Sequence, residues 1–306
     1  AGAFAGQAAL IVQALRSPDI LLLDEVGDNS GVADDGVIAA DLTFSRLITA
    51  VQQAGGPTYT YAQIDPFDAE DGGELGSNAR MGLLYNAQRV QMVDNPGDAG
   101  TDNQVICASG QPSLAFSPGR IGANAGIFLD SRKPLAAQFS VEGERLFVIG
   151  VHFDGKESDT PEFGATQPPI LQSAARRAAQ AQLVNDFVQQ FLTCEPTAKI
   201  VVIGNPNDDL FSTPVTTLRG ANLFSLMDLL PAGARYSRVG AGNSRVTAQA
   251  LVSNALWTNV PRFDVVHVHA EFASSTVHDD PVVAKIALTE VPQGNLYLPL
   301  ISRTEP

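Results

Sequence analysis

The chain has 306 residues, and its 33 acidic side chains against 19 basic ones give a net charge of −14. Hydrophobic residues make up 44% of the sequence, which is enough for a substantial core and excludes a disordered chain. General binding to polyanions is disfavoured, because phosphates must be neutralised by lysine or arginine. Every apolar run is too short for a membrane-spanning helix.

The first 60 residues predict two helices on either side of a buried strand. Apolar residues recur at helical spacing over residues 4–15, and Ser17-Pro18 ends this helix. The apolar run 20–23 predicts a buried strand. A second helix is predicted over residues 44–51, and the glycines and proline of residues 55–57 end it.

Short strands separated by turns are predicted from residue 58 to residue 152. A long helix over residues 179–191 and an apolar strand over residues 200–203 follow. The other predicted strands are 59–64, 81–85, 104–108, 136–141, 146–153, 263–269 and 282–288. Strands outnumber helices and do not alternate strictly with them, so we predict an α/β fold with two sheets face to face and helices outside.

Residues 1–291 contain no linker or repeat and are predicted to form one domain. Residues 292–306 are predicted to be a C-terminal tail or linker. The apolar stretch 296–301 within them has two possible interpretations, an edge strand or the start of a link to a larger surface protein. The N-terminus lacks a basic region and a cleavage site, which excludes an attached signal peptide. A signal already removed and a start inside a longer precursor both stay open.

Cys107 and Cys194 are the two cysteines of the chain. They are not part of a CxxC pair, which disfavours a thiolate zinc site. Two alternatives are left open, a long-range disulfide in an oxidising compartment and two buried free thiols.

Polar residues gather at the ends of the predicted strands, where a sheet delivers side chains into a cleft. They are Glu25, Arg80, Arg132, His152, Asn205, Asn207, Asp208, His278, Asp279 and Asp280. Carboxylates, arginines, histidines and amides together suggest a metal-assisted phosphoryl site. The alternative for each acid is a helix cap or turn, and for each histidine a structural role.

Several segments, in order, resemble the endonuclease/exonuclease/phosphatase superfamily, with the closest likeness to its bacterial secreted nucleases. They include SPDILLLDEVGDNSGVADDGV, SPGRIGANAGIFLDSRKPLAAQF, FVIGVHFDGK, IVVIGNPNDDLFSTPVTTL and FDVVHVHAEFASSTVHDDPVVA. The resemblance covers about residues 15–290. It implies a four-layer α/β/β/α sandwich of two mixed sheets, and descent from divalent-metal-dependent phosphodiesterases. It also implies a secreted or cell-surface location.

The resemblance assigns roles to residues that match the family motifs. Glu25 matches the metal-binding glutamate after the first strand. Arg132 matches an arginine that contacts phosphate, and we expect Arg80 to contact phosphate as well. His152 matches a histidine that stabilises the phosphoryl group. Asn207 matches the phosphate-contacting asparagine of the family's GDFN turn.

Other family positions are substituted here. Asn205 stands where an aspartate aligns the attacking water, and Ala248 stands where an aspartate orients the general-base histidine. Gln249, the next residue of the same motif, is a further substituted position. His278 takes the position of a metal-ligand aspartate, and Asp279 that of the general base. The family's N-terminal strand, which carries a further asparagine, lies upstream of the first residue of this chain.

These substitutions predict a degenerate active site. General acid–base catalysis is typically worth about 10²–10⁴-fold, and an amide such as Asn205 cannot act as an anionic base. Mg²⁺ prefers oxygen ligands to an imidazole such as that of His278. We therefore expect an acidic, secreted or surface pseudoenzyme with a binding or structural role.

The alternative is an active extracellular nuclease or phosphodiesterase that depends on a divalent metal. In that case Glu25 and His278 would hold Mn²⁺ or Zn²⁺ in place of Mg²⁺. Asp279 would then orient His152 or His278 as a rebuilt base. Nucleic acid or another phosphodiester would be the ligand.

Three further features leave alternatives open. The loops 28–35, 65–74 and 94–102 are rich in Asp, Asn and Gly, so they are either Ca²⁺ sites or solvated acidic loops. His267 and His269 lie two apart on a predicted strand and share a face, as a metal clip or as sheet-surface residues. The polar composition and the apolar tail together suggest self-association into a filament or surface layer.

Overall fold

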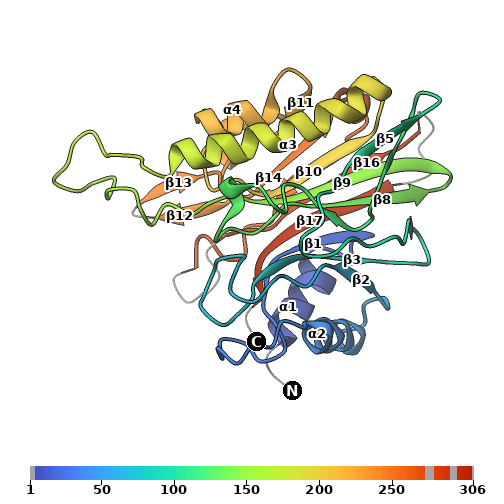
Figure 1. Cartoon of the computed structure of the whole chain (residues 1–306), viewed down its shortest axis with the longest axis horizontal. Coiled ribbons are helices and arrows are strands. Elements are labelled where there is room, and N and C mark those ends of the chain that lie inside the picture. Colours follow the sequence, from blue (N-terminus) through green and yellow to red (C-terminus); the bar gives the residue numbers. More distant parts are fainter. Residues whose placement is uncertain (1–3, 241, 273–278, 290–294, 305–306) are drawn as a thin grey trace.

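The computed structural model describes residues 4–240, 242–272, 279–289 and 295–304. Within these residues, two mixed β-sheets pack face to face and helices cover their outer faces (Figure 1). Helices α3 (Ala174–Cys194) and α4 (Thr213–Arg219) cover one sheet, and α1 (Ala5–Ala9) and α2 (Asp41–Gln53) cover the other. The predicted four-layer α/β/β/α sandwich is therefore confirmed.

The first sheet has the strand order β15-β16-β17-β1-β3-β2 among the described residues. Its strands are β1 (Ile20–Val26), β2 (Thr60–Gln63), β3 (Arg80–Tyr85), β15 (Arg262–Val265), β16 (Val282–Ala287) and β17 (Asn295–Thr304). β17 pairs antiparallel with β16 and parallel with β1. The C-terminal segment, for which the sequence suggested an edge strand or a link, is thus an inner strand of this sheet.

The second sheet has the order β11-β14-β10-β9-β8-β4, and β7 also pairs with β8, within the described part of the chain. Its strands are β4 (Gln91–Met92), β7 (Gly119–Arg120), β8 (Leu135–Val141), β9 (Glu144–His152), β10 (Ile200–Asn205), β11 (Leu223–Ser225) and β14 (Gln249–Ser253). β9 and β10 run parallel, so their carboxyl ends lie at the same edge of the sheet.

Two hairpins lie outside the main sheets. They are β5 (Val105–Ala108) with β6 (Gln111–Leu114), and β12 (Arg238–Gly240) with β13 (Asn243–Arg245). Cys107 on β5 forms a disulfide with Cys194 at the end of α3, which decides between the two cysteine alternatives. The short helices are the π-helix η1 (Leu10–Ala14), the 3₁₀ turns η2 (Gly126–Phe128), η3 (Leu226–Leu229) and η4 (Ala232–Ala234), and α5 (Asn254–Trp257).

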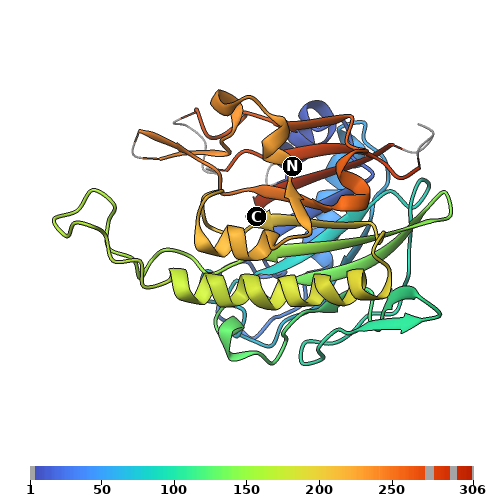
Figure 2. The same ribbon diagram turned by 90° about the horizontal axis from the view of Figure 1, so that it is seen from above.

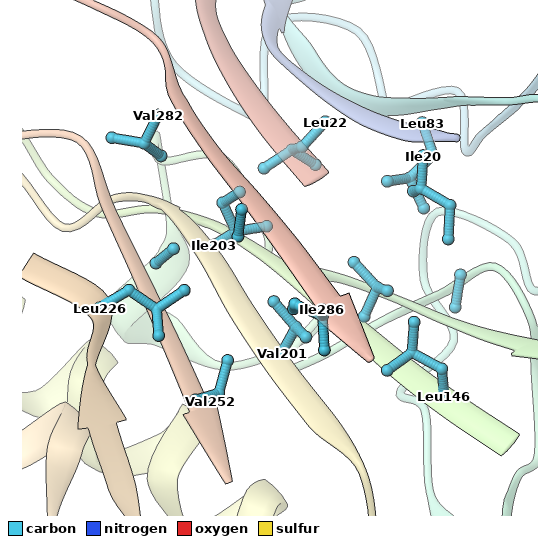
Figure 3. Close-up of a cluster of buried hydrophobic side chains, with 14 of the residues drawn as sticks. Ile20, Leu22, Leu83, Leu146, Val201, Ile203, Leu226, Val252, Val282 and Ile286 are labelled. Atoms are coloured by element: carbon cyan, nitrogen blue, oxygen red, sulfur yellow. The ribbon is translucent and has the colours of Figure 1, made fainter. Parts of the chain in front are cut away.

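Strand β1 is apolar along most of its length because both of its faces are buried. Leu22 points into the core between the two sheets, while Leu21 and Leu23 pack toward α1 and α2. Figure 3 shows Leu22 together with Ile203 and Val282 in the layer between the sheets. Full burial of such a side chain contributes about 1.5–3 kcal/mol, so this layer holds the two sheets together.

The long loop from residue 153 to residue 173 joins β9 to α3 and projects beyond the sheets (Figure 2). It leaves β9 directly after His152, at the edge where β10 also ends. The helices of the described residues are all too short or too polar to cross a membrane.

Candidate functional site

A cleft of about 950 Å³ opens at the carboxyl ends of β1, β9 and β10. His152 and Asn205 are register partners on adjacent parallel strands, so the sheet brings both to this edge. The predicted site residues that line the cleft are Glu25, Arg132, His152, Asn205, Asn207 and Asp279. The two sheets thus bring together residues that are far apart in the sequence.

His152 is buried, and both of its ring nitrogens have partners within the protein. Nδ1 lies 2.6 Å from a carboxylate oxygen of the fully buried Asp24. Nδ2 of Asn207 lies 3.2 Å from Nε2 and donates to the carbonyl oxygen of Phe153 at 2.7 Å. The carbonyl oxygen of Phe153 can only accept, so the amide group of Asn207 is oriented with its NH₂ toward both Phe153 and His152. Nε2 of His152 therefore accepts a hydrogen bond from Asn207, and the proton on Nδ1 is donated to Asp24.

Asp24 is a site residue that the sequence did not predict. The sequence suggested Asp279 as the carboxylate that orients His152, whereas in the structure Asp24 does so. The register of β1 against β3 shifts between Leu23 and Val26, and Glu25 has a φ of 57°. This bulge turns Asp24 inward to His152 and Glu25 into the cleft.

The carboxylate of Glu25 is paired with a guanidinium group. Nη2 of Arg132 lies 3.0 Å from Oε1 of Glu25, and Nε2 of His152 lies 3.8 Å from the same oxygen. Nε and Nη1 of Arg132 are buried and have no hydrogen-bond partner among the described residues. Glu25 therefore faces a fixed positive charge.

Asp279, which the resemblance assigns to the general-base position, is also held by neighbours. Oγ1 of Thr247 donates to its carboxylate at 2.5 Å, and Nη1 of Arg238 lies 3.6 Å away. Burial raises the pKa of Asp279 above its usual value of 3.8. This carboxyl group is therefore part of a local network on the side of the cleft that is lined by β12, β13 and Thr247.

The substituted positions on β10 and β14 have structural roles. Asn205 accepts a hydrogen bond from the backbone N–H of Asn207 at 2.9 Å and so shapes the turn after β10. Ala248 packs in the core between the sheets. Gln249 is buried and donates to the backbone carbonyl of Asp208 at 3.1 Å. None of these three side chains carries a titratable carboxylate.

Arg80 does not line the cleft, so the structure does not bring it to the phosphate position that we expected. Its side chain is 1% exposed, forms an ion pair with Asp65 and donates to the carbonyl oxygen of Asn78 at 2.9 Å. Desolvation by burial lowers the pKa of Arg80 to about 10, against the opposing effect of Asp65. Arg80 is a buried structural cation.

His267 and His269 follow the end of β15 rather than lying on a strand. Nδ1 of His267 lies 2.8 Å from the fully buried Asp280, and its ring stacks on Tyr236. The backbone N–H of His269 donates to Asp280 at 2.7 Å, and burial lowers the pKa of His269. The expectation of a shared strand face is wrong, and Asp280 anchors this turn.

The predicted metal ligand His278 lies outside the described residues. Among the residues that are described, no three His, Cys, Asp or Glu side chains are grouped so as to hold a metal ion. This statement includes the acidic loops for which Ca²⁺ was considered. At Glu25 the nearby groups are the guanidinium of Arg132 and a histidine nitrogen already bonded to Asn207. The described residues therefore do not fit a resident divalent cation.

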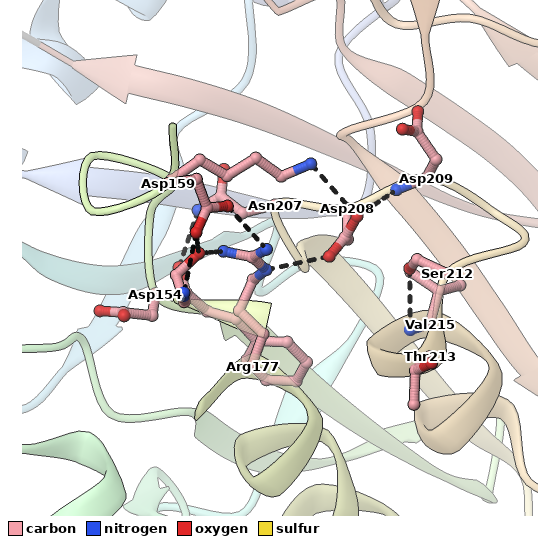
Figure 4. A network of polar contacts seen from close by, with 12 residues as sticks. Asp154, Asp159, Arg177, Asn207, Asp208, Asp209, Ser212, Thr213 and Val215 are labelled. Carbon is pink, nitrogen blue, oxygen red and sulfur yellow. Dashed lines mark hydrogen bonds and ion pairs between the residues drawn. The ribbon is translucent and has the colours of Figure 1, made fainter. Parts of the chain in front are cut away.

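Arg177 is a further buried charge that the sequence did not single out (Figure 4). Its guanidinium contacts Asp208 at 3.0 Å, the carbonyl oxygen of Gly155 at 2.9 Å and Asp159 at 3.6 Å. It thereby ties α3 to the turn after β10 and to the long loop after β9. Arg177 lies one turn before Ala181 on the core face of α3, and this spacing was the feature of the sequence that could have indicated its burial.

Cations that line the cleft are paired with carboxylates. Besides Arg132 with Glu25 and Arg238 with Asp279, Lys156 lies 3.1 Å from Asp208. Within the described part of the chain, the fourth such cation is Arg245, which is paired with Glu162 and Asp209. A phosphate group entering the cleft would have to compete with these carboxylates for each cation.

No protein-family model matches the sequence, and no curated protein matches it. Solved structures do resemble this fold. An endonuclease/exonuclease/phosphatase from Bacteroides vulgatus has 13% identity and a TM-score of 0.56, with 94% of this chain and 90% of that chain covered. A functionally unknown conserved protein from Enterococcus faecalis V583 has 14% identity and a TM-score of 0.53, with 92% and 90% covered.

TDP2 from C. elegans aligns at 14% identity and a TM-score of 0.50, with 86% of this chain and 61% of that chain covered. At such identities the likeness concerns the fold alone. The chain therefore has the endonuclease/exonuclease/phosphatase fold, the sandwich of nuclease- and phosphatase-like domains.

Proposed function

We propose that this chain is a secreted or surface-associated binding domain whose nuclease-type cleft has lost metal-dependent phosphodiester hydrolysis. The observation that carries the proposal is that Glu25 and His152, which line the cleft, are bonded to other groups of the protein. Glu25 is bound by Arg132, and Nε2 of His152 is bound by Asn207. Groups that a catalytic site would turn toward substrate or metal are here satisfied by the protein itself.

The chemistry of the substituted positions supports the same proposal. The general-base position holds Asp279, which accepts from Thr247 and lies beside Arg238. The position assigned to the water-aligning aspartate holds the amide of Asn205, which has no titratable carboxylate and cannot act as an anionic base. Loss of general acid–base catalysis alone costs about 10²–10⁴-fold in rate.

The Cys107–Cys194 disulfide supports an extracytoplasmic location. Disulfides form and persist in oxidising compartments and are rare in the reducing cytosol. We therefore propose a location outside the cell or on its surface, where the domain would bind a ligand or a further part of a surface assembly.

The test is a hydrolysis assay with the purified chain. Plasmid, single-stranded DNA, RNA and a chromogenic phosphodiester are each incubated with Mg²⁺, Mn²⁺, Ca²⁺ or Zn²⁺. We expect turnover no higher than that of the Glu25→Ala variant. Glu157→Ala is a matched control, because Glu157 also lines the cleft but is exposed. Metal-dependent turnover that Glu25→Ala abolishes and Glu157→Ala preserves would refute the proposal.

One observation favours a second candidate, an impaired phosphodiesterase. A buried carboxylate that fixes the tautomer of a histidine is the arrangement by which hydrolases orient a general base. Asp24 and His152 have this arrangement next to the cleft. If turnover is found, this candidate requires that His152→Gln abolishes it and that Asp279→Asn leaves most of it.

A further inference from the structure

The carboxylate of Glu25 has a permanent cation at its side. Oε1 of Glu25 lies 3.0 Å from Nη2 of Arg132, and the two side chains are only 25% and 10% exposed. A guanidinium group stays protonated at all physiological pH values, so its charge cannot be removed by titration. The negative charge of Glu25 is therefore neutralised without any bound ion.

Arg132 is enclosed so that it cannot easily leave this position. A Cβ atom on Gly73, which has a φ of +88°, would lie 3.0 Å from Nη1 of Arg132. The absence of a side chain at residue 73 thus allows the backbone to cover the guanidinium. Nε and Nη1 are already buried without partners among the described residues. Loss of Glu25 to a metal ion would leave the guanidinium buried and unpaired, which is unfavourable.

Among the described residues, no three His, Cys, Asp or Glu side chains are grouped beside Glu25 so as to hold a metal ion in place of this cation. One donor that lies close to it is Nε2 of His152, 3.8 Å from Oε1 of Glu25. Its lone pair accepts from Asn207. Mg²⁺ keeps several water ligands but is held through one or two free carboxylates, whereas the carboxylate of Glu25 is engaged by Arg132. Ca²⁺ takes about six to eight oxygen ligands, and an imidazole is a poor ligand for either ion.

We propose that Arg132 replaces the divalent cation beside Glu25, so that this position binds no divalent metal while Arg132 is present. The inference rests on the proposed function, because both describe a cleft that has lost its metal chemistry. It adds the residue responsible and a consequence. Without Arg132, the carboxylate of Glu25 loses its internal partner. A transition-metal ion with bonds of about 2.0–2.2 Å can then bind this carboxylate and compete with Asn207 for Nε2 of His152, 3.8 Å from Oε1.

The consequence is tested with Co²⁺, whose visible absorption reports nitrogen and oxygen ligation. Wild type, Arg132→Ala, Arg132→Lys and the double variant Arg132→Ala/Glu25→Gln are titrated, and their folding is compared by circular dichroism. We expect Arg132→Ala to bind Co²⁺ at least about tenfold more tightly than wild type. Arg132→Lys should behave as wild type because it keeps the charge, and the double variant should lose the gain. Equal Co²⁺ binding by wild type and Arg132→Ala would overturn the proposal.

A second measurement needs no substitution at Arg132. Mn²⁺ at millimolar concentration broadens NMR signals close to a bound ion. We expect the imidazole signals of His152 in the wild-type chain to stay sharp. Broadening that disappears in Glu25→Gln would refute the proposal even if Arg132→Ala does not fold.

The two proposals can fail separately. If wild type binds Mn²⁺ at Glu25 but cleaves no phosphodiester, the role of Arg132 is wrong and the binding-domain proposal stands. If wild type hydrolyses a phosphodiester with no metal at Glu25, the binding-domain proposal fails and the role of Arg132 stands.

Discussion

Asp24 and Glu25 are neighbours in the sequence, yet they act in different parts of the site. The bulge in β1 sends Asp24 into the protein, where it orients His152, and sends Glu25 toward Arg132. Each carboxylate thus has an internal partner of complementary charge or hydrogen-bonding capacity. The chemistry of the cleft is therefore decided by these pairings rather than by the residue types alone.

Asp159 gives a pH-dependent prediction at the same scale. Burial opposes its ionisation, but hydrogen bonds from the backbone and hydroxyl of Ser173 and the charge of Arg177 outweigh it and lower the pKa of Asp159. A lowered folded-state pKa stabilises the protein above about pH 4, and this contribution is lost as the pH falls through the folded-state pKa. Asp159→Asn should therefore lower the free energy of unfolding near pH 7 by about 1 kcal/mol.

The measurement is urea unfolding of wild type and Asp159→Asn at a series of pH values. The difference between them should shrink toward zero in acid. Asp186→Asn, an exposed aspartate on α3 that contacts Gln182, is the control and should change little at any pH. A difference for Asp159→Asn that does not depend on pH would contradict the electrostatic explanation.

At the scale of elements, the β5–β6 hairpin depends on its covalent link to α3. The hairpin forms a separate two-stranded sheet, and such a sheet is marginally stable by itself. The Cys107–Cys194 disulfide joins it to the end of α3 across 87 residues of sequence. The bond therefore restrains a long segment that includes β8 and β9.

Removal of this disulfide should lower the free energy of unfolding by about 2–4 kcal/mol, since the unfolded chain regains the freedom of a long loop. The double variant Cys107→Ser/Cys194→Ser is compared with wild type by thermal and urea unfolding. A reducing agent should destabilise wild type to a similar extent and leave the double variant unchanged. An effect of the reducing agent on the double variant would show that another cause is at work.

At the scale of the whole molecule, the C-terminal segment completes the first sheet. β17 lies between β16 and β1 and pairs with both, so it joins the N-terminal half of that sheet to the C-terminal half. Without it, the facing edges of β1 and β16 would lose their hydrogen-bond partners, although β1 is almost wholly buried. The fold therefore depends on a segment that the sequence left outside the domain.

A chain that ends at residue 291 should lose its cooperative thermal transition and aggregate. A chain that ends at residue 304 keeps β17 and should unfold as the full chain does. Circular dichroism and light-scattering chromatography distinguish the outcomes. If the shorter chain stays folded and only its oligomeric size falls, the segment serves self-association instead, as the apolar tail had suggested.

Elements that depend on neighbouring residues were predictable, and contacts between distant residues were not. Apolar periodicity located β1, α2, α3 and β10, because burial of a face imposes a local pattern. The strand predicted over residues 263–269 ends at Val265, since Asp280 binds the backbone beyond it. The family motifs identified Glu25, Arg132, His152 and Asn207 as candidate site residues. They could not predict the hydrogen-bond and ion-pair partners of these side chains in the folded chain.

The sequence by itself determined the α/β class, the apolar cores of the strands and the absence of a titratable group at Asn205 and Ala248. These are properties of residue type and local spacing. Only the tertiary structure decided that Asp24 holds His152 across 128 residues, that Arg132 neutralises Glu25, and that β17 lies inside a sheet. Such pairings depend on how distant parts of the chain come together. Other pairings of the same residues would give the same local pattern in the sequence.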